Sequence, residues 1–346
     1  MRAHWGWLWR WLKPLLAVLI VGCVGVQFAR LLGQPEVWQA ADRLEPAALL
    51  AAAGGYLLAL TCWGGYWLRL LARQGQPVPL GPGLRAYYVS QVGKYVPGKA
   101  WTLLLRAGLV RGYGVSLGTA VLAGFYETLT AMAAGALLAA VLLPLVSGSG
   151  QLGQQALVLL AVAGVPILPG VFNRLVARLA KPFRPADAPP LPRISTLTLL
   201  GGLGQSLLGW AALGAGLTLI VAGLVPAELG QLQSSAGLAL RCTAYLALAY
   251  VAGFLVLPAP GGLGVRELIL QQTLAAELAA AYDSPTAQGL AALVALALRA
   301  VWTVAEVALA GLAYCCYAGP RPPAPQPSQA TPAPCPTADP PAEASA

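Results

Sequence analysis

Two short segments interrupted by proline and glycine carry the side chains best suited to chemistry. The first spans residues 87–101 and places Lys94 and Lys99 on either side of Pro97-Gly98. Proline removes a backbone hydrogen bond from a helix, and the N-terminus of a helix favours anions. Two lysines at such a break therefore predict a phosphate-sized binding site. The alternative is an ordinary basic loop on the cytoplasmic side of a membrane.

Aromatic side chains accompany this first break. Tyr95 and Trp101 stand close to it and could line a path for an acyl or isoprenoid chain. The alternative is an aromatic belt at the membrane interface, where tyrosine and tryptophan are enriched. The run ending at Lys99 also approaches a nucleotide-binding P-loop, but Ala100 replaces the Ser or Thr that binds Mg²⁺. The sequence thus argues against nucleotide hydrolysis.

The second broken segment has the sequence Leu-Pro-Ala-Pro-Gly-Gly-Leu-Gly-Val-Arg-Glu over residues 257–267. Irregular backbone at membrane depth is tolerated only against protein or a water-filled cavity. Arg266 could hold an anionic headgroup, and Glu267 could hold the arginine, cap the following helix or take a proton. The alternative is a tight turn with an acid in the first helical turn. The residues expected to break the helix are Pro258, Gly261, Gly262 and Gly264.

Four isolated charges lie inside apolar runs: Glu127, Arg241, Arg299 and Glu306. A charge at the centre of a bilayer costs about 2.5–3.5 kcal/mol on insertion scales, so such a residue is rarely idle. Arg299 and Glu306 are seven residues apart and share one helix face, too far apart to bond directly. Each therefore predicts a partner on another segment. Glu127 is a candidate for proton coupling, and structural pairing inside the bundle is the alternative.

The sequence contains no recognisable catalytic set. Its single histidine, His4, is near the N-terminus, and its six cysteines include no C-x-x-C pair. No metal-spaced pair of carboxylates occurs in a loop. We therefore predict no metal, no cofactor and no enzymatic activity.

The elements that carry these residues are membrane spans. The chain of 346 residues is 58% hydrophobic and only 10% charged, whereas soluble domains are about 25% charged. Several apolar runs reach the length of about 20 residues that a membrane helix needs. The net charge of +9 lies mostly in short loops, which indicates topology rather than nucleic-acid binding. The fold class predicted is an all-α polytopic membrane protein.

The hydropathy pattern predicts about six full spans and two broken re-entrant segments. Full spans are expected at residues 14–32, 46–71, 116–146, 156–172, 194–225 and 286–317, and broken segments at 84–110 and 235–281. The second broken segment could instead cross the membrane twice. Each half contains a full span, a broken segment and another full span, which suggests an inverted repeat. Residues 1–13 form a cytoplasmic N-terminus, 14–317 the transmembrane domain and 318–346 a disordered cytoplasmic tail rich in Pro and Ala.

The two Pro-Gly motifs, with Glu127 between them, resemble the lysylphosphatidylglycerol synthase transmembrane region, a flippase-like membrane family. The resemblance covers roughly residues 10–317. In the full-length synthases this region resembles a lipid flippase, and a soluble aminoacyl-transferase domain follows it. Here a Pro-rich tail follows, so the transfer of lysine is expected to be absent. The positions that match the family pattern are Lys94, Pro97, Gly98, Lys99, Glu127, Pro258, Gly261, Gly262, Gly264, Arg266 and Glu267.

The resemblance implies a translocase of a phospholipid or a polyprenyl-phosphate-linked lipid across the inner (plasma) membrane. Lys94, Lys99 and Arg266 are expected to bind phosphate, and Glu127 and Glu267 to balance those charges or couple to protons. The partner is then a membrane lipid or lipid-linked substrate, and not a nucleic acid. The alternative is a non-catalytic partner or regulator of a cell-envelope glycosyltransferase or lipid synthase.

Overall fold

The computed structural model describes residues 44–95, 101–146, 150–180, 193–224, 235–256 and 264–315, with isolated positions between 26 and 42. Within these ranges the secondary structure is entirely helical. Five of the described helices are long and apolar enough to cross a membrane, or six if one bent pair forms a single span. The prediction of an all-α polytopic membrane protein is confirmed. The span expected at residues 14–32 lies almost wholly outside the described residues.

The helices follow the predicted apolar runs closely. The long ones are α3 (Pro46–Arg73), α6 (Leu117–Val146), α9 (Thr196–Leu224), α10 (Ser235–Leu255) and α12 (Ser284–Cys315). The shorter ones are α4 (Leu80–Ser90), η1 (Gln91–Tyr95), α5 (Trp101–Val110), η2 (Arg111–Tyr113), α7 (Gly150–Gly164), η3 (Val165–Ile167), α8 (Pro169–Ala180) and α11 (Val265–Leu278).

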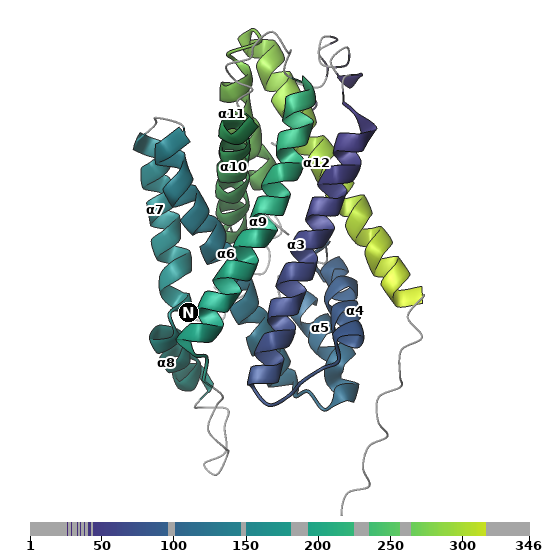
Figure 1. Ribbon diagram of the computed structural model, residues 1–346, viewed down its shortest axis with the longest axis vertical. Helices are drawn as coiled ribbons and strands as arrows, with labels where there is room; N and C mark the ends of the chain where they lie inside the picture. The colour runs from purple at the N-terminus through teal and green to yellow at the C-terminus, as the bar shows by residue number, and fades with distance from the viewer. Residues whose placement is uncertain are drawn as a thin grey trace, which may run out of the picture.

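Helices α3 and α9 run side by side through the middle of the bundle (Figure 1). Small residues at intervals of seven along α9, Gly202, Gly209 and Gly216, face α3. A Cβ added at Gly216 would lie 2.8 Å from the Cα of Ala52. Close backbone approach matters here because lipid tails provide no hydrophobic drive for two apolar helices to associate. The glycines thus make α3 and α9 the central packed pair.

The segment predicted as one straight span at residues 156–172 differs from that expectation. Helix α7 already begins at Gly150, and the chain bends by 62° between Leu157–Ile167 and Pro169–Arg178. Pro166 and Pro169 lack the N–H groups that would continue the helical hydrogen bonds through the bend. Helix α8 consequently turns away from α7 and carries the basic residues Arg174 and Arg178.

The two broken segments differ in build. In the first, α4 and α5 have 11 and 10 residues, so neither reaches the length needed to span a membrane. In the second, α10 has 21 residues and is long enough to cross, whereas α11 has 14. Helices α4 and α5 lie at one end of the bundle and α11 lies toward the other, as an inverted repeat requires (Figure 1).

A glycine on the near side of each break allows its two parts to pack together. A Cβ at Gly93 in η1 would lie 2.8 Å from the backbone nitrogen of Thr102 in α5. A Cβ at Gly253 in α10 would lie 3.1 Å from the Cβ of Arg266 in α11. These contacts position the charged residues of α5 and α11 against the helices that precede them.

Candidate functional site

The start of α11 places a carboxylate between backbone and arginines. Gly264, which precedes the helix, has a φ of +83°, a conformation that glycine adopts without steric cost. The backbone N–H of Gly264 donates a hydrogen bond of 2.8 Å to Oε2 of Glu267. This contact satisfies an N–H group at the helix start and fixes the orientation of the carboxylate. Of the roles predicted for Glu267, capping the helix is one that the geometry supports.

The other carboxylate oxygen of Glu267 faces two guanidinium groups. Arg266 donates from Nη2 to Oε1 over 3.1 Å, and Nη1 of Arg299 lies 3.6 Å from the same oxygen. Arg266 and Glu267 are buried, and the side chain of Arg299 is only 15% exposed. Arg299 comes from α12, so the ion pairs join the second broken segment to the last span. Among the described residues, two positive charges share one negative charge here, which leaves a surplus of +1.

Aromatic rings surround the Arg266 guanidinium. Its Cζ lies 4.7 Å from the ring centroid of Tyr250 in α10 and 5.8 Å from that of Trp302 in α12. The Trp302 ring stacks in turn on Tyr56 of α3, with centroids 5.0 Å apart. The ring quadrupoles favour a cation at these faces and help to offset its desolvation. The rings also connect Arg266 to the residues around Tyr56.

Tyr56 is the centre of a second polar group. Its hydroxyl donates to Oε2 of Glu306 over 2.6 Å and accepts from Nζ of Lys94 over 3.0 Å. Lys94 also forms an ion pair with Glu306. Lys94 belongs to η1 and Glu306 to α12, so these contacts join the first broken segment to the last span.

Both broken segments therefore meet on one face of α12. Lys94 of the first contacts Glu306, and Glu267 of the second contacts Arg299. Arg299 and Glu306 share that face because seven residues make about two helical turns. The prediction that each needs a partner on another segment is confirmed. We call the five charged side chains Lys94, Arg266, Glu267, Arg299 and Glu306, with Tyr56 and Trp302, the α12 network.

A small cavity opens within the α12 network. Its polar wall is formed by Arg266, Glu267, Arg299 and Trp302. Its apolar wall is formed by Leu246, Leu270, Ala295 and Leu298. The space holds about one water-sized group. The α12 network therefore has no room for a lipid headgroup in this conformation, and its charged side chains contact one another.

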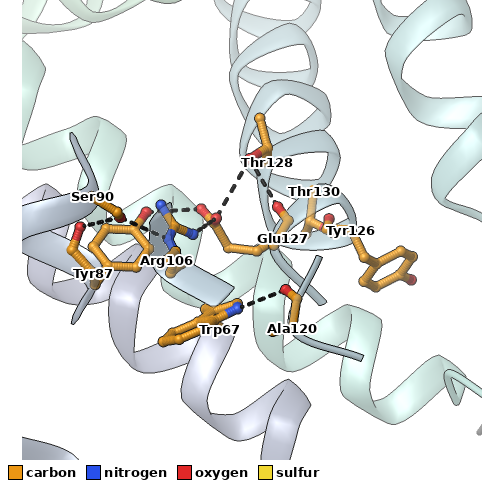
Figure 2. Close-up of polar contacts among 10 residues, drawn as sticks. Trp67, Tyr87, Ser90, Arg106, Ala120, Tyr126, Glu127, Thr128 and Thr130 are labelled. Carbon is orange, nitrogen blue, oxygen red and sulfur yellow. Dashed lines mark hydrogen bonds and ion pairs between the residues drawn. The ribbon is translucent and has the colours of Figure 1, made fainter. Parts of the chain in front are cut away.

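The first half contains a comparable but separate cluster around Arg106 and Glu127. Arg106 donates from Nη1 to Glu127 Oε2 and from Nε to Ser90 Oγ, each over 3.1 Å. The hydroxyl of Tyr87 donates to Glu127 Oε1 over 3.1 Å. Figure 2 shows the guanidinium between the Tyr87 ring and the carboxylate, with its Cζ 3.9 Å from the ring centroid. Trp67 borders the same guanidinium and points its indole toward Ala120.

One guanidinium meets one carboxylate in this cluster, and the side chains of Arg106 and Glu127 are each only 3% exposed. Arg241 and Glu277 form another such pair between α10 and α11, 2.7 Å apart, and Tyr245 donates to the same carboxylate. Charge balance at both pairs indicates a structural role. The α12 network differs from both because its charges do not cancel.

The family model of the lysylphosphatidylglycerol synthase TM region matches residues 11–308. The chain belongs to this family. The predicted membership is confirmed, and the matched residues include both broken segments and α12 as far as Ala308. None of the curated proteins matches the chain.

The predicted site residues that the structure describes lie in three environments. Lys94, Arg266 and Glu267 come together in the α12 network. Glu127 pairs with Arg106 in the separate first-half cluster, and Trp101 begins α5 with 47% of its surface exposed. Gly264 forms the turn before α11. The others fall outside the described residues: Pro97, Gly98, Lys99, Pro258, Gly261, Gly262 and the side chain of Tyr95.

Several residues of the α12 network were not predicted as site residues from the sequence. Arg299 and Glu306 were recognised as isolated charges, but Tyr56 and Trp302 were not singled out. A signal for Trp302 does exist, because it follows Arg299 by three residues and precedes Glu306 by four. Both spacings place it on the face that the two charges share.

Proposed function

We propose that this protein is a translocase that moves a phospholipid or a polyprenyl-phosphate-linked lipid across the inner membrane, without enzymatic chemistry. Its family membership supports a multi-pass membrane protein of flippase-like type. The observation that carries the proposal is the surplus positive charge of Arg266 and Arg299 around the single carboxylate of Glu267. In this proposal both termini face the cytoplasm, as the basic loops suggest.

Surplus positive charge at a buried site favours an anion. A buried cation without a full counter-charge is costly, and a second anionic group beside two arginines reduces that cost. The guanidinium fork also matches two oxygens of a phosphate with parallel hydrogen bonds. Arg266 and Arg299 lie on different helices, so a phosphate held by both would link α11 to α12.

Glu267 acts as a placeholder in this mechanism. Its Oε1 atom occupies the position between the two arginines that a phosphate oxygen would take. An incoming phosphate would displace that oxygen, while Oε2 keeps its hydrogen bond to Gly264. The empty and loaded states then differ by a local exchange of anions. This exchange keeps the arginines paired throughout the transport cycle.

Loading requires the α12 network to open, because its cavity holds only about one water-sized group. Separation of α11 from α12 would enlarge the cavity between Arg266 and Arg299. The same movement of α12 would pull on the ion pair of Glu306 with Lys94, at the other broken segment. A coupling of the two ends through α12 suits alternating access between inverted repeats. Since the sequence carries no nucleotide-binding motif, transport is passive or ion-driven.

The proposal is tested by reconstituting the full chain in vesicles and following a fluorescent phosphatidylglycerol across the bilayer by quenching. Arg266→Gln and Arg299→Gln are each expected to slow translocation about 10-fold or more, because hydrogen bonds to charged groups contribute about 1.5–3 kcal/mol. Arg241→Gln is the matched control, since it removes an arginine from the same half but outside the cavity. Wild-type rates for both test variants would refute the proposal.

The same preparation separates transport from the alternative of a membrane partner. A wild-type chain that is inserted and folded, yet moves lipid no faster than protein-free vesicles, contradicts the translocase. Stable co-purification with a cell-envelope glycosyltransferase or lipid synthase would then favour the regulator hypothesis.

A further inference from the structure

Helix α8 begins where the chain has already almost crossed the membrane. Helix α7 and the η3 turn contain 15 and 3 residues, and together they extend about 28 Å. The hydrocarbon core of a bilayer is about 30 Å thick. The bend of 62° follows, and Figure 1 shows α8 at the lower end of α7. This length places α8 at a membrane surface.

Contacts with two spans hold α8 in its bent orientation. The Phe172 ring packs on Tyr126 of α6, with centroids 4.4 Å apart, and the Tyr126 hydroxyl donates to the carbonyl oxygen of Ile167 over 2.9 Å. Asn173 donates from Nδ2 to the carbonyl oxygen of Ile194 over 3.0 Å, and its Oδ1 accepts from the Ile194 N–H over 3.1 Å. One face of α8 is thus fixed to α6 and to the start of α9.

A second face of α8 is apolar and exposed. Val171 and Leu175 lie one turn apart and are 39% and 43% exposed, and Leu168, just before the helix, is 49% exposed. This face continues the exposed apolar surface of α7 and η3, where Val162 and Val165 are each 51% exposed. In a membrane protein such a surface on a spanning helix faces lipid. The apolar face of α8 therefore extends the lipid-facing surface around the bend.

The neighbouring face of α8 is basic. Arg174 and Arg178 are exposed and lie one turn apart, and neither forms an ion pair within the part of the chain that the structure describes. Helix α8 itself contains no Asp or Glu. Like charges four residues apart repel each other, so an anion beside both is favourable. A guanidinium fork matches two oxygens of a phosphate group.

We infer that α8 lies along the headgroup layer at one membrane surface and binds the phosphates of anionic lipids through Arg174 and Arg178. Val171 and Leu175 insert among the adjoining acyl chains. Amphipathic helices with an apolar face beside basic residues adopt this placement. An acidic protein segment would match the arginines but would not account for an apolar face continuous with the lipid-facing surface of α7. The site is separate from the α12 network and independent of transport.

The test compares photolabelling of α8 by two lipids in the full chain, reconstituted in phosphatidylcholine bilayers. A small, equal fraction of either phosphatidylglycerol or phosphatidylcholine carries a diazirine in an acyl chain, and labelled residues are located by mass spectrometry. We expect phosphatidylglycerol to label α8 about 5-fold more strongly at low salt, the factor that one basic residue near the surface contributes. The preference should shrink at high salt, because exposed charges are screened.

The double variant Arg174→Gln with Arg178→Gln removes the positive charge and keeps the apolar face. Both lipids are then expected to label α8 equally. The matched control is Arg69→Gln with Arg73→Gln, which removes two exposed arginines, also four residues apart, from the end of α3. This control is expected to keep the preference at α8. The wild-type comparison of the two lipids needs no variant, so it decides even if the double variant does not fold.

Four outcomes would overturn the assignment. Labelling of α8 by neither lipid, with oxidation of Leu175 by hydroxyl radicals, would show that the helix faces water. Equal labelling of the wild-type chain at low salt would exclude a phosphate site. Loss of the preference in millimolar inorganic phosphate would indicate a site for free anions, and loss of labelling with polyglutamate would indicate an acidic protein partner. Arg266→Gln should leave the labelling of α8 unchanged, so failure of the translocase proposal is a separate result.

Discussion

The two halves of the molecule build comparable clusters at their breaks. In the first half, Arg106 follows the break, stacks on Tyr87 from before it and pairs with Glu127 on the next span. In the second half, Arg266 follows the break and stacks on Tyr250 from before it. In both, an arginine closes the two parts of a broken segment on each other through an aromatic ring.

The clusters differ in how the arginine is neutralised. Arg106 meets one carboxylate on the next span, and their charges cancel. Arg266 meets Glu267 on its own helix, and the next span supplies a second cation, Arg299, instead of an anion. The pair of Arg106 and Glu127 is balanced in charge and holds three helices together, and we call it the clamp. The cluster around Arg266 carries surplus positive charge and lies beside a cavity. Related geometry thus serves stability in one half and ligand binding in the other.

The largest effect that tests this comparison is expected at the balanced pair. Glu127→Ala leaves Arg106 buried without its counter-charge, and breaking a buried pair in this way costs about 3–5 kcal/mol. Thermal unfolding of the purified chain in detergent should show a large loss of stability. The double variant Arg106→Met with Glu127→Leu should recover most of it, because no uncompensated charge remains. A loss below about 1 kcal/mol for Glu127→Ala would contradict the clamp.

A smaller effect is expected at the glycines that close the two breaks. Gly93→Ala would place a Cβ 2.8 Å from the backbone nitrogen and 2.9 Å from the Cα of Thr102, which cannot move without shifting α5. We expect a loss of about 1–3 kcal/mol, the usual range for overpacking. Gly253→Ala should cost less, since its nearest contact is 3.1 Å. Equal losses in unfolding experiments would show that the breaks are equally tight.

The sequence predicted the spans well because every backbone polar group in a bilayer must be satisfied internally, which makes long apolar runs into helices. It also placed Arg299 and Glu306 on one face, since that needs only the helical period. Their partners could not be predicted, because Lys94 and Glu267 reach α12 through the packing of separate helices. Trp302 was overlooked because one aromatic residue in an apolar span is not distinctive. The bend beside Pro169 was missed although that proline is visible in the sequence.

The turn before α11 provides a prediction of about 1–2 kcal/mol. Gly264 has a φ of +83° and a ψ of −50°, outside the αL region, and an L-residue at such a positive φ costs at least about that amount. Gly264→Ala should therefore lower the unfolding temperature moderately. The backbone N–H of residue 264 still donates to Oε2 of Glu267 in this variant. The carboxylate should therefore stay in place, and lipid binding should change little. Gly75→Ala, at a φ of +74° in the loop after α3, is a matched control for the backbone cost. Loss of binding in Gly264→Ala alone would show that this backbone conformation itself shapes the site.

The smallest effect on stability is expected where the effect on function is large. Arg299→Gln removes one of two cations from Glu267, whose carboxylate keeps Arg266 and the Gly264 N–H as partners. Because no buried charge is left alone, unfolding experiments should show a loss below about 1 kcal/mol, far less than at Glu127. Lipid binding should nevertheless fall, since the surplus positive charge disappears. If Arg299→Gln were as destabilising as Glu127→Ala and left binding intact, the second cluster would be a clamp like the first, and the distinction between the halves would fail.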